Sequence, residues 1–268
     1  MCAETEIAQT AGFGSHNNQF VGNQINNYYE GMTPEQAVDF AMDLFWKNFP
    51  KLQKAAEEVA QKRVEEFCNE AVQKLQRDGT ANYPALADPG VQYVLVDTQK
   101  NYARYGTQEM LNTLTELVYN RVKNNDDFIL KVTIDKAISV ASMLTTTQLD
   151  YLSLLFLCTE VKHENIKTLQ DLIDHMAIIC DAFPVSIENV SVSYLNILGC
   201  VQISLPDPVK IFANCYGFEE SIVEAICPQR IKDLATDYGL SYVGIILAIV
   251  NIEQKTDFRF DLHVWIHE

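Results

Sequence analysis

Residues 33–77 read TPEQAVDFAMDLFWKNFPKLQKAAEEVAQKRVEEFCNEAVQKLQR, the longest run of helical periodicity in this chain. Thr33 as N-cap, Pro34 at the first helical position and Gln36 three residues after the cap form a helix start signal. The apolar residues that follow recur in alternating steps of four and three: Val38, Met42, Phe45, Phe49, Leu52, Ala56 and Val59. This spacing is typical of a coiled-coil or bundle seam, so it predicts a long helix whose apolar stripe needs a partner.

The same stretch predicts a division within the helix. Pro50 removes a backbone donor and disfavours the helical conformation at Phe49, so we expect a kink there or two helices that meet end to end. Beyond Val59 the apolar positions follow in steps of four, and such a drift favours packing in a bundle over an extended coiled coil. We therefore expect the first part, Pro34–Phe49, to contact other copies and the second part to pack on its own chain.

The residues before this helix form an Asn/Gln/Gly-rich tract, GFGSHNNQFVGNQINNYYEG at residues 12–31. Its composition is that of a flexible tail, but amide ladders and stacked aromatics also suit short strands that pair between identical chains. Residues 19–27 faintly resemble bacterial amyloid-signalling and RHIM-type segments, which stack homotypically. The predicted oligomerisation residues are therefore Phe20, Val21, Ile25, Tyr28 and Tyr29 of the tract and Val38, Met42, Phe45 and Phe49 of the helix.

Further helices are predicted by cap and stop signals. Residues 33–160 are expected to form a helical domain, with helix starts at Asp88-Pro89, Thr107 and Thr147 and a helix around Ile134. Residues 167–268 are expected to form an acidic α+β domain. Its predicted helices begin at Thr168, about Ile187, Pro208, Glu219 and Ser241.

The end of the chain carries a different pattern. Phe258, Phe260, Leu262, Val264 and Ile266 alternate with polar or amphipathic residues, which predicts a strand. A helix followed by such a strand resembles the closing half of a winged helix. The expected fold class is therefore mainly α: a helical bundle with a long kinked N-terminal helix, a short N-terminal β tract and a small winged-helix-like C-terminal unit.

Charge and composition limit the function classes. The net charge of −16 opposes contact with nucleic-acid phosphates, and no basic cluster offsets it. The first Lys or Arg is Lys47, so no secretory signal is indicated, and no apolar run is long enough to span a bilayer. Seven scattered cysteines without a Cys-x-x-Cys pair fit free thiols in a reducing cytosol. We expect a cytoplasmic protein without a cofactor or metal, without constitutive membrane insertion, and with homo-oligomeric or protein partners.

Two small clusters are candidate sites. Tyr93, Tyr102 and Arg104 recur on one predicted helix, where they would line a pocket or simply pack with wet hydroxyls. Asp171, Asp174 and His175 are neighbours on another helix and suit an acid/base cluster, although a solvated helix face is the simpler interpretation. No phosphate loop, nucleophile elbow or zinc-protease motif is present, so no catalytic residue is predicted.

Several segments together resemble an uncharacterised family of bacterial proteins. They are QTAG at 9–12, NFPKLQ at 48–53, DPGVQYVL at 88–95, QKNYARYG at 99–106 and LTTTQLDYLSLLFL at 144–157, with weaker similarity at 199–203 and 258–266. The resemblance transfers no catalytic motif, and it implies an accessory role, such as anti-phage defence. The sequence thus favours a non-enzymatic homo-oligomeric interaction protein, a sensor or adaptor in bacterial defence. The alternative is a hydrolase or nucleotide-acting enzyme with an unrecognised site in the C-terminal domain.

Overall fold

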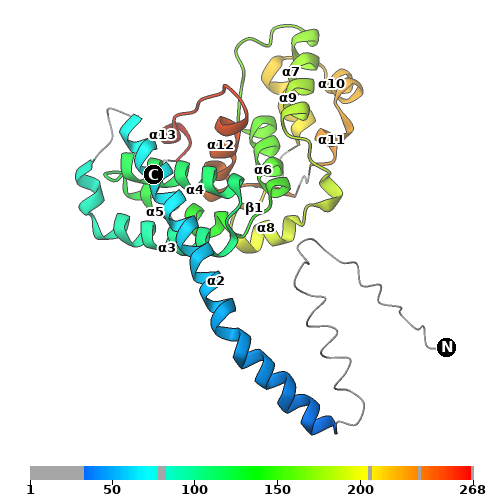
Figure 1. Cartoon of the computed structure of the whole chain (residues 1–268). Helices are drawn as coiled ribbons and strands as arrows, with labels where there is room; N and C mark the ends of the chain where they lie inside the picture. Colours follow the sequence, from blue (N-terminus) through cyan, green and yellow to red (C-terminus); the bar gives the residue numbers. More distant parts are fainter. Residues whose placement is uncertain (1–32, 78–82, 205–206, 235–236, 267–268) are drawn as a thin grey trace, which may run out of the picture. The chain divides into compact units, whose positions relative to one another are not determined.

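A computed structural model of the chain describes residues 33–77, 83–204, 207–234 and 237–266. The chain divides into two compact units, Met1–Glu58 and Val59–Glu268. The described residues are mainly helical and include one two-stranded antiparallel sheet, as Figure 1 shows. The mainly α fold predicted from the sequence is confirmed.

The elements follow one another with short connections. The α-helices are α2 (Pro34–Arg77), α3 (Pro89–Tyr105), α4 (Gln108–Lys123), α5 (Phe128–Ala141), α6 (Thr146–Thr159), α7 (Leu169–Ala182), α8 (Val192–Leu198), α9 (Pro208–Tyr216), α10 (Glu220–Ile226), α11 (Gln229–Lys232), α12 (Tyr242–Lys255) and α13 (Leu262–Trp265). Two 3₁₀ turns, η1 (Tyr83–Ala87) and η2 (Ile187–Asn189), and two strands, β1 (Val201–Ile203) and β2 (Tyr238–Leu240), complete the order.

Local capping explains most helix starts. Thr33 and Gln36 form the predicted reciprocal pair at the start of α2, with N–H to side-chain oxygen distances of 3.0 and 3.3 Å. The predicted caps of α3, α4, α7 and α12 are likewise confirmed, because their side chains accept from the first-turn backbone: Asp88, Thr107, Thr168 and Ser241. For α6 the prediction of Thr147 as the cap was wrong, since Thr145 forms a capping box with Gln148.

The core of the second unit is built around α6 and α12. Both helices are buried on nearly every side, at Leu149–Cys158 and Gly244–Ile252, as expected for helices without a polar face. They pack along each other, and α12 also packs on α5. A Cβ at Gly244 would lie 1.9 Å from the carbonyl oxygen of Cys200, so only glycine allows this approach.

A buried polar network lies between these two helices. The Asn251 amide donates to Asp150 Oδ1 at 2.9 Å and to Ser153 Oγ at 2.8 Å, and Lys255 forms an ion pair with Asp150. Because each buried polar group has a partner, the network fixes the register of two otherwise apolar helices without leaving an unsatisfied charge.

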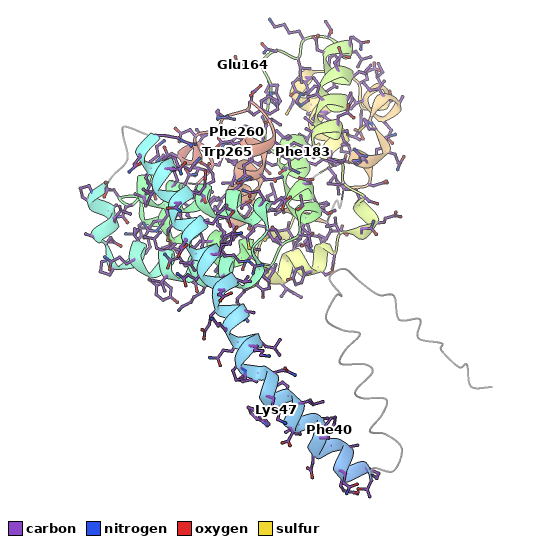
Figure 2. All side chains as sticks on the ribbon, in the orientation of Figure 1. Phe40, Lys47, Glu164, Phe183, Phe260 and Trp265 are labelled. Carbon is purple, nitrogen blue, oxygen red and sulfur yellow. The ribbon has the colours of Figure 1, made fainter. Side chains whose placement is uncertain are left out.

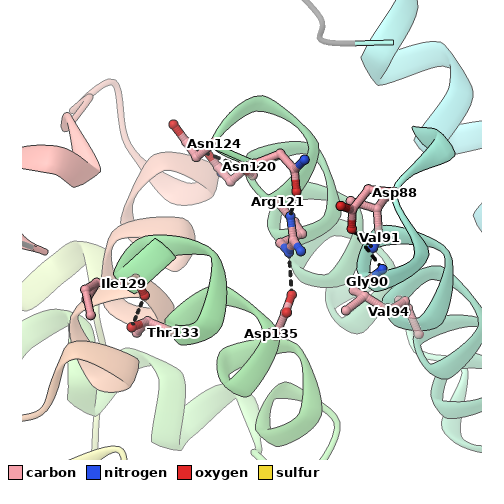
Figure 3. Close-up of polar contacts among 12 residues, drawn as sticks. Asp88, Gly90, Val91, Val94, Asn120, Arg121, Asn124, Ile129, Thr133 and Asp135 are labelled. Carbon is pink, nitrogen blue, oxygen red and sulfur yellow. Dashed lines mark hydrogen bonds and ion pairs between the residues drawn. The ribbon is translucent and has the colours of Figure 1, made fainter. Parts of the chain in front are cut away.

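Polar contacts also join α3, α4 and α5 (Figure 3). Arg121, which is almost completely buried, donates from Nε to Asp135 Oδ1 at 2.6 Å and from Nη1 to Asn125 Oδ1 at 2.6 Å. Burial raises the pKa of Asp135, and the Arg121 guanidinium opposes that rise. This pair therefore ties α4 to α5 beside the capped start of α3.

The predicted helix from Glu219 towards Tyr238 was wrong, because the segment forms α10, α11 and then β2. Pro228 explains the break, since it disfavours the helical conformation at Cys227, which is extended at φ −67° and ψ 127°. The strand β2 pairs antiparallel with β1, with Val201 opposite Leu240 and Ile203 opposite Tyr238. The predicted helix from Ile187 to Leu198 is likewise divided, into η2 and α8.

The predicted strand at 258–266 was also wrong. This segment is an irregular stretch followed by α13, which Asp261 caps. Its backbone donors bond to side chains instead of a neighbouring strand: Phe260 N–H donates to Glu253 Oε1 at 2.8 Å, and Phe258 N–H donates to Thr256 Oγ1 at 3.2 Å. The winged-helix interpretation depended on this strand, so that interpretation stays a prediction.

The division into units differs from the predicted domains. The core cluster of the second unit joins α4, α5 and α6 of predicted domain 33–160 to α7, α9 and α12 of predicted domain 167–268. The segment between Thr159 and Leu169 therefore connects helices of one core. The predicted tract at 1–32 lies outside the described residues.

Candidate functional site

The candidate site is the apolar seam of α2, defined by Val38, Met42, Phe45, Phe49, Leu52, Ala56 and Val59. The helix continues through Pro50 in one element of 44 residues, so the seam lies on a single helix. Its large side chains remain 40% to 61% exposed. Figure 2 labels Phe40 and Lys47 among the side chains of this part of α2. A continuous apolar stripe with exposed side chains is a candidate interaction surface.

An aromatic cluster lies at the centre of the seam. The rings of Phe45, Trp46 and Phe49 contact one another, with centroid separations of 5.3 Å for Phe45–Trp46, 5.4 Å for Phe45–Phe49 and 5.7 Å for Trp46–Phe49. Trp46 was not among the predicted residues, although its place beside Phe45 on the seam's edge was a readable signal. Large aromatic side chains at the middle of a patch are typical of the residues that contribute most to binding.

The opposite faces of the same helix segment are polar. Lys54 lies 4.0 Å from Glu58 in an exposed ion pair, and Gln53 donates to Glu57 at 3.1 Å. Such pairs one turn apart support a solvated helix face, so the helix is amphipathic along its exposed length.

The seam ends where α2 begins to bond to its own unit. Continuation of the heptad would place Arg63 and Glu66 in the stripe. Instead, Arg63 Nη1 donates to the carbonyl oxygens of Ala103 at 2.8 Å and Arg104 at 3.2 Å, and Tyr102 Oη donates to Glu66 Oε2 at 3.0 Å. The buried side chains of α2 follow at Phe67, Ala71 and Leu75. The prediction that the second part of the helix packs on its own chain is confirmed from Arg63 onward, whereas Leu52 and Val59 of that part stay 60% and 50% exposed.

The predicted pocket residues are not brought together. Tyr93 is exposed, whereas Tyr102 is buried against Glu66, and burial with that carboxylate raises the pKa of Tyr102 to about 12. Arg104 is exposed and lies 5.7 Å from the ring centroid of its neighbour Tyr105. Nine residues along a helix separate Tyr93 from Tyr102 by about half a turn, so the two face opposite ways.

The structure describes only some of the predicted oligomerisation residues. Val38, Met42, Phe45 and Phe49 all lie exposed on α2. The other predicted oligomerisation residues lie outside the described residues: Phe20, Val21, Ile25, Tyr28 and Tyr29.

The predicted acid/base cluster contains a histidine pair that the sequence did not reveal. His163 and His175 lie with ring centroids 4.3 Å apart and line a cavity of about 310 Å³ with Asp171 and Asp174. Burial lowers the pKa of both imidazoles, and that of His175 falls to about 4 with the neighbouring His163 contributing.

This cavity lacks the parts of a hydrolytic site. The Asp171 carboxylate accepts from the backbone N–H of Thr168 at 2.8 Å, so it acts as a helix cap. Neither His163 Nε2 nor His175 Nε2 has a hydrogen-bond partner among the described residues, and the cavity lining contains no Ser, Thr or Cys. A side-chain nucleophile beside its base is the arrangement that covalent catalysis requires, and this cavity offers none.

The described residues contain neither a cluster suited to a metal ion nor a helix suited to a membrane. No three His, Cys, Asp or Glu side chains are grouped so that they could hold a metal ion. Within the same residues, no helix has the length and apolar composition needed to cross a membrane.

The fold and the seam define a mainly helical protein with an exposed, heptad-spaced apolar seam on α2. Residues 31–237 match the sequence model of a family described only as ":-like". This match covers well over half of the chain, so the chain belongs to that uncharacterised family. Comparisons with curated proteins and with solved structures found no match.

Proposed function

We propose that this chain is a non-enzymatic interaction protein that assembles into homo-oligomers through the seam of α2. The observation that carries the proposal is the exposure of seven heptad-spaced positions on one helix, with the contacting rings of Phe45, Trp46 and Phe49 at their centre. Burial of that stripe against a second apolar helix would remove it from water, and this is the dominant favourable term in association.

A second copy of the same helix is the partner that the spacing favours. Alternating steps of four and three keep one apolar stripe facing a neighbouring helix. Two identical stripes of this spacing can pack their side chains against each other along their whole length. The alternative, a helix of the same chain, is less favoured because α2 meets its own unit through different positions, beginning with Arg63 and Glu66 and continuing at Phe67. Homo-oligomers with a shared patch are also the commonest soluble assemblies.

The finer parts of the proposal rest on the sequence alone. Residues 1–32 would add contacts between copies, and Pro50 would bend the helix. The place of action would be the cytoplasm, and the role would be that of a sensor or adaptor in bacterial anti-phage defence. That role is supported only by the resemblance of segments such as NFPKLQ and DPGVQYVL to a bacterial family.

Light scattering after size exclusion tests the proposal on the full chain. We expect a mass that is a multiple of 30.4 kDa and that falls with dilution. Deletion of residues 1–31 should lower the mass if the N-terminal tract contributes. Substitution of the seam residues of α2 by polar residues should lower the mass both in the full chain and in the chain without residues 1–31. A monomeric full chain at all accessible concentrations would refute assembly.

A further inference from the structure

A polar groove in the second unit is independent of the seam. It consists of two neighbouring cavities of about 620 and 450 Å³, which share Asn120, Lys123, Arg259 and Phe260. The walls come from α4, the end of α12 and the segment that follows it, and the larger cavity also reaches the last turns of α2. Figure 3 shows Asn120 and Asn124 on α4 beside the buried Arg121. Cavities of this size are in the range of small-molecule sites.

One pair of charges in the larger cavity is already neutralised. Lys74 forms an ion pair with Glu116, and the Lys74 Nζ also lies 5.2 Å from the ring centroid of Tyr119. The remaining charged side chains of this cavity are two cations, Lys123 and Arg259, and two carboxylates, Glu70 and Glu253. These four charged side chains determine which charge a ligand of the cavity can carry.

The two cations have no carboxylate hydrogen-bonded to them among the described residues. Lys123 is exposed, and its Nζ lies 5.9 Å from the centroid of Tyr119. Arg259 Nη1 donates to the backbone carbonyls of Thr256 at 3.0 Å and Phe258 at 2.6 Å. Arg259 Nη1 also donates to the Glu253 carbonyl oxygen at 3.3 Å, and the guanidinium lies near enough to the Glu253 carboxylate to oppose the rise that burial causes in its pKa.

The two carboxylates and Thr115 line the larger cavity. Glu70 is half-buried, and Glu253 is held by the Phe260 N–H at 2.8 Å while burial raises its pKa. Thr115 is 3% exposed, and its Oγ1 has no hydrogen-bond partner among the described residues. The Oγ1 atom is closed off from solvent, so it does not face the open space of the groove.

The balance of charge selects the class of ligand. A ligand with only negative charge would be attracted to Lys123 and Arg259 but repelled by Glu70 and Glu253. A ligand with only positive charge would be attracted to the two carboxylates but repelled by the two cations. For either kind of ion the repulsion therefore offsets the attraction. A molecule with one ammonium and one carboxylate satisfies both pairs.

We propose that this groove binds a small zwitterionic amino compound, a free amino acid or dipeptide. Its carboxylate lies at Lys123 and Arg259, and its ammonium lies at Glu70 and Glu253. The smaller cavity, which continues past Lys123 and Arg259 towards His263, leaves room for a second residue.

The test measures the melting temperature of the full chain with each common amino acid and with Gly-Gly, Ala-Ala and Gly-Gln at about 10 mM, followed by calorimetry on the compounds that stabilise it. N-acetylated and carboxamide forms of the same compounds serve as probes with one charge removed. The variants are Lys123→Gln and Glu70→Gln. Lys100→Gln, an exposed lysine on α3 outside the groove, is the matched control.

We expect at least one zwitterion to raise the melting temperature, and we expect removal of either ligand charge to raise its Kd about tenfold or more. Lys123→Gln and Glu70→Gln should weaken binding by a similar factor, while Lys100→Gln should not. The proposal is overturned if no zwitterion in the panel stabilises the chain, if the blocked forms bind as tightly, or if Lys123→Gln behaves like Lys100→Gln. A site that prefers an N-acetylated form would be an anion site and would also overturn it.

Discussion

The paired substitution Phe45→Ser and Phe49→Ser tests the seam directly, because these rings form its centre. We expect the variant to lose self-association while its unit Val59–Glu268 unfolds at the same denaturant concentration as in the unchanged chain. The two rings contact each other and Trp46 on one exposed helix, and the core of the second unit does not include them. Their loss should therefore affect the contact between copies and leave the fold intact.

The magnitude follows from the surface that the rings still expose, 47% for Phe45 and 40% for Phe49. Full burial of a phenylalanine contributes up to about 3 kcal/mol, so burial of the exposed part contributes roughly 1 kcal/mol per ring. A pair of copies buries four such rings, about 4 to 5 kcal/mol in all. Since about 1.4 kcal/mol corresponds to a tenfold change, the variant should bind itself about a thousandfold more weakly.

Analytical ultracentrifugation over a wide concentration range measures this change. The control is Ile197→Ser with Ile203→Ser, which removes side chains that are 79% and 82% exposed on α8 and β1 and so removes at least as much exposed apolar surface elsewhere. We expect the control to associate like the unchanged chain. Equal association of the seam variant and the unchanged chain would refute the reasoning, and equal weakening in both variants would show nonspecific hydrophobic contact.

Three further outcomes test the fold. His175 has a folded pKa of about 4, below its ordinary 6.5, so stability present above pH 6.5 should fall by up to about 3 kcal/mol towards pH 4, and urea melts of His175→Phe should lose most of this slope. Arg121→Ala leaves the half-buried Asp135 without its partner and should cost about 2 kcal/mol in chemical denaturation; a loss below about 1 kcal/mol would contradict the role assigned to this pair. Gly244→Ala should cost about 1–3 kcal/mol, because its Cβ would meet the Cys200 carbonyl, and an unchanged urea midpoint would show that α12 can shift freely.

The sequence predicted helix starts well because capping is local. A side-chain oxygen at Thr33, Asp88 or Thr107 accepts from an N–H two or three residues away, so the signal and its result occupy the same short segment. The lower accuracy of the α6 start has the same origin. Thr145, Thr146 and Thr147 are chemically equivalent, and only the position of Gln148 three residues later distinguishes Thr145.

The failures arose where distant residues decide the conformation. Near residue 260 the alternation of Phe258, Phe260 and Leu262 looks like a strand, but neither strand of the described sheet pairs with it. The rings pack on the core instead, with Phe260 lying 5.3 Å from Phe156 of α6 and Phe258 lying 5.3 Å from His163 in the connection after α6. The short β2 gave no periodicity to read, because its pairing with β1 lies far along the chain. The His163–His175 contact was unpredictable for the same reason.

The length of the seam is limited by charge. Arg63 occupies the position where the next apolar residue of the heptad would fall, and its guanidinium bonds to the carbonyl oxygens that end α3, while Glu66 accepts from Tyr102. Both side chains have partners in their own unit, so a second copy could extend the seam past Val59 only by breaking those bonds and burying their charges. The proposed association along α2 would therefore be confined to about three heptads, Val38 to Val59. If positions 63 and 66 were apolar, a second copy and α3 would compete for the same face of α2. The charged side chains of Arg63 and Glu66 bond to α3 and so prevent that competition.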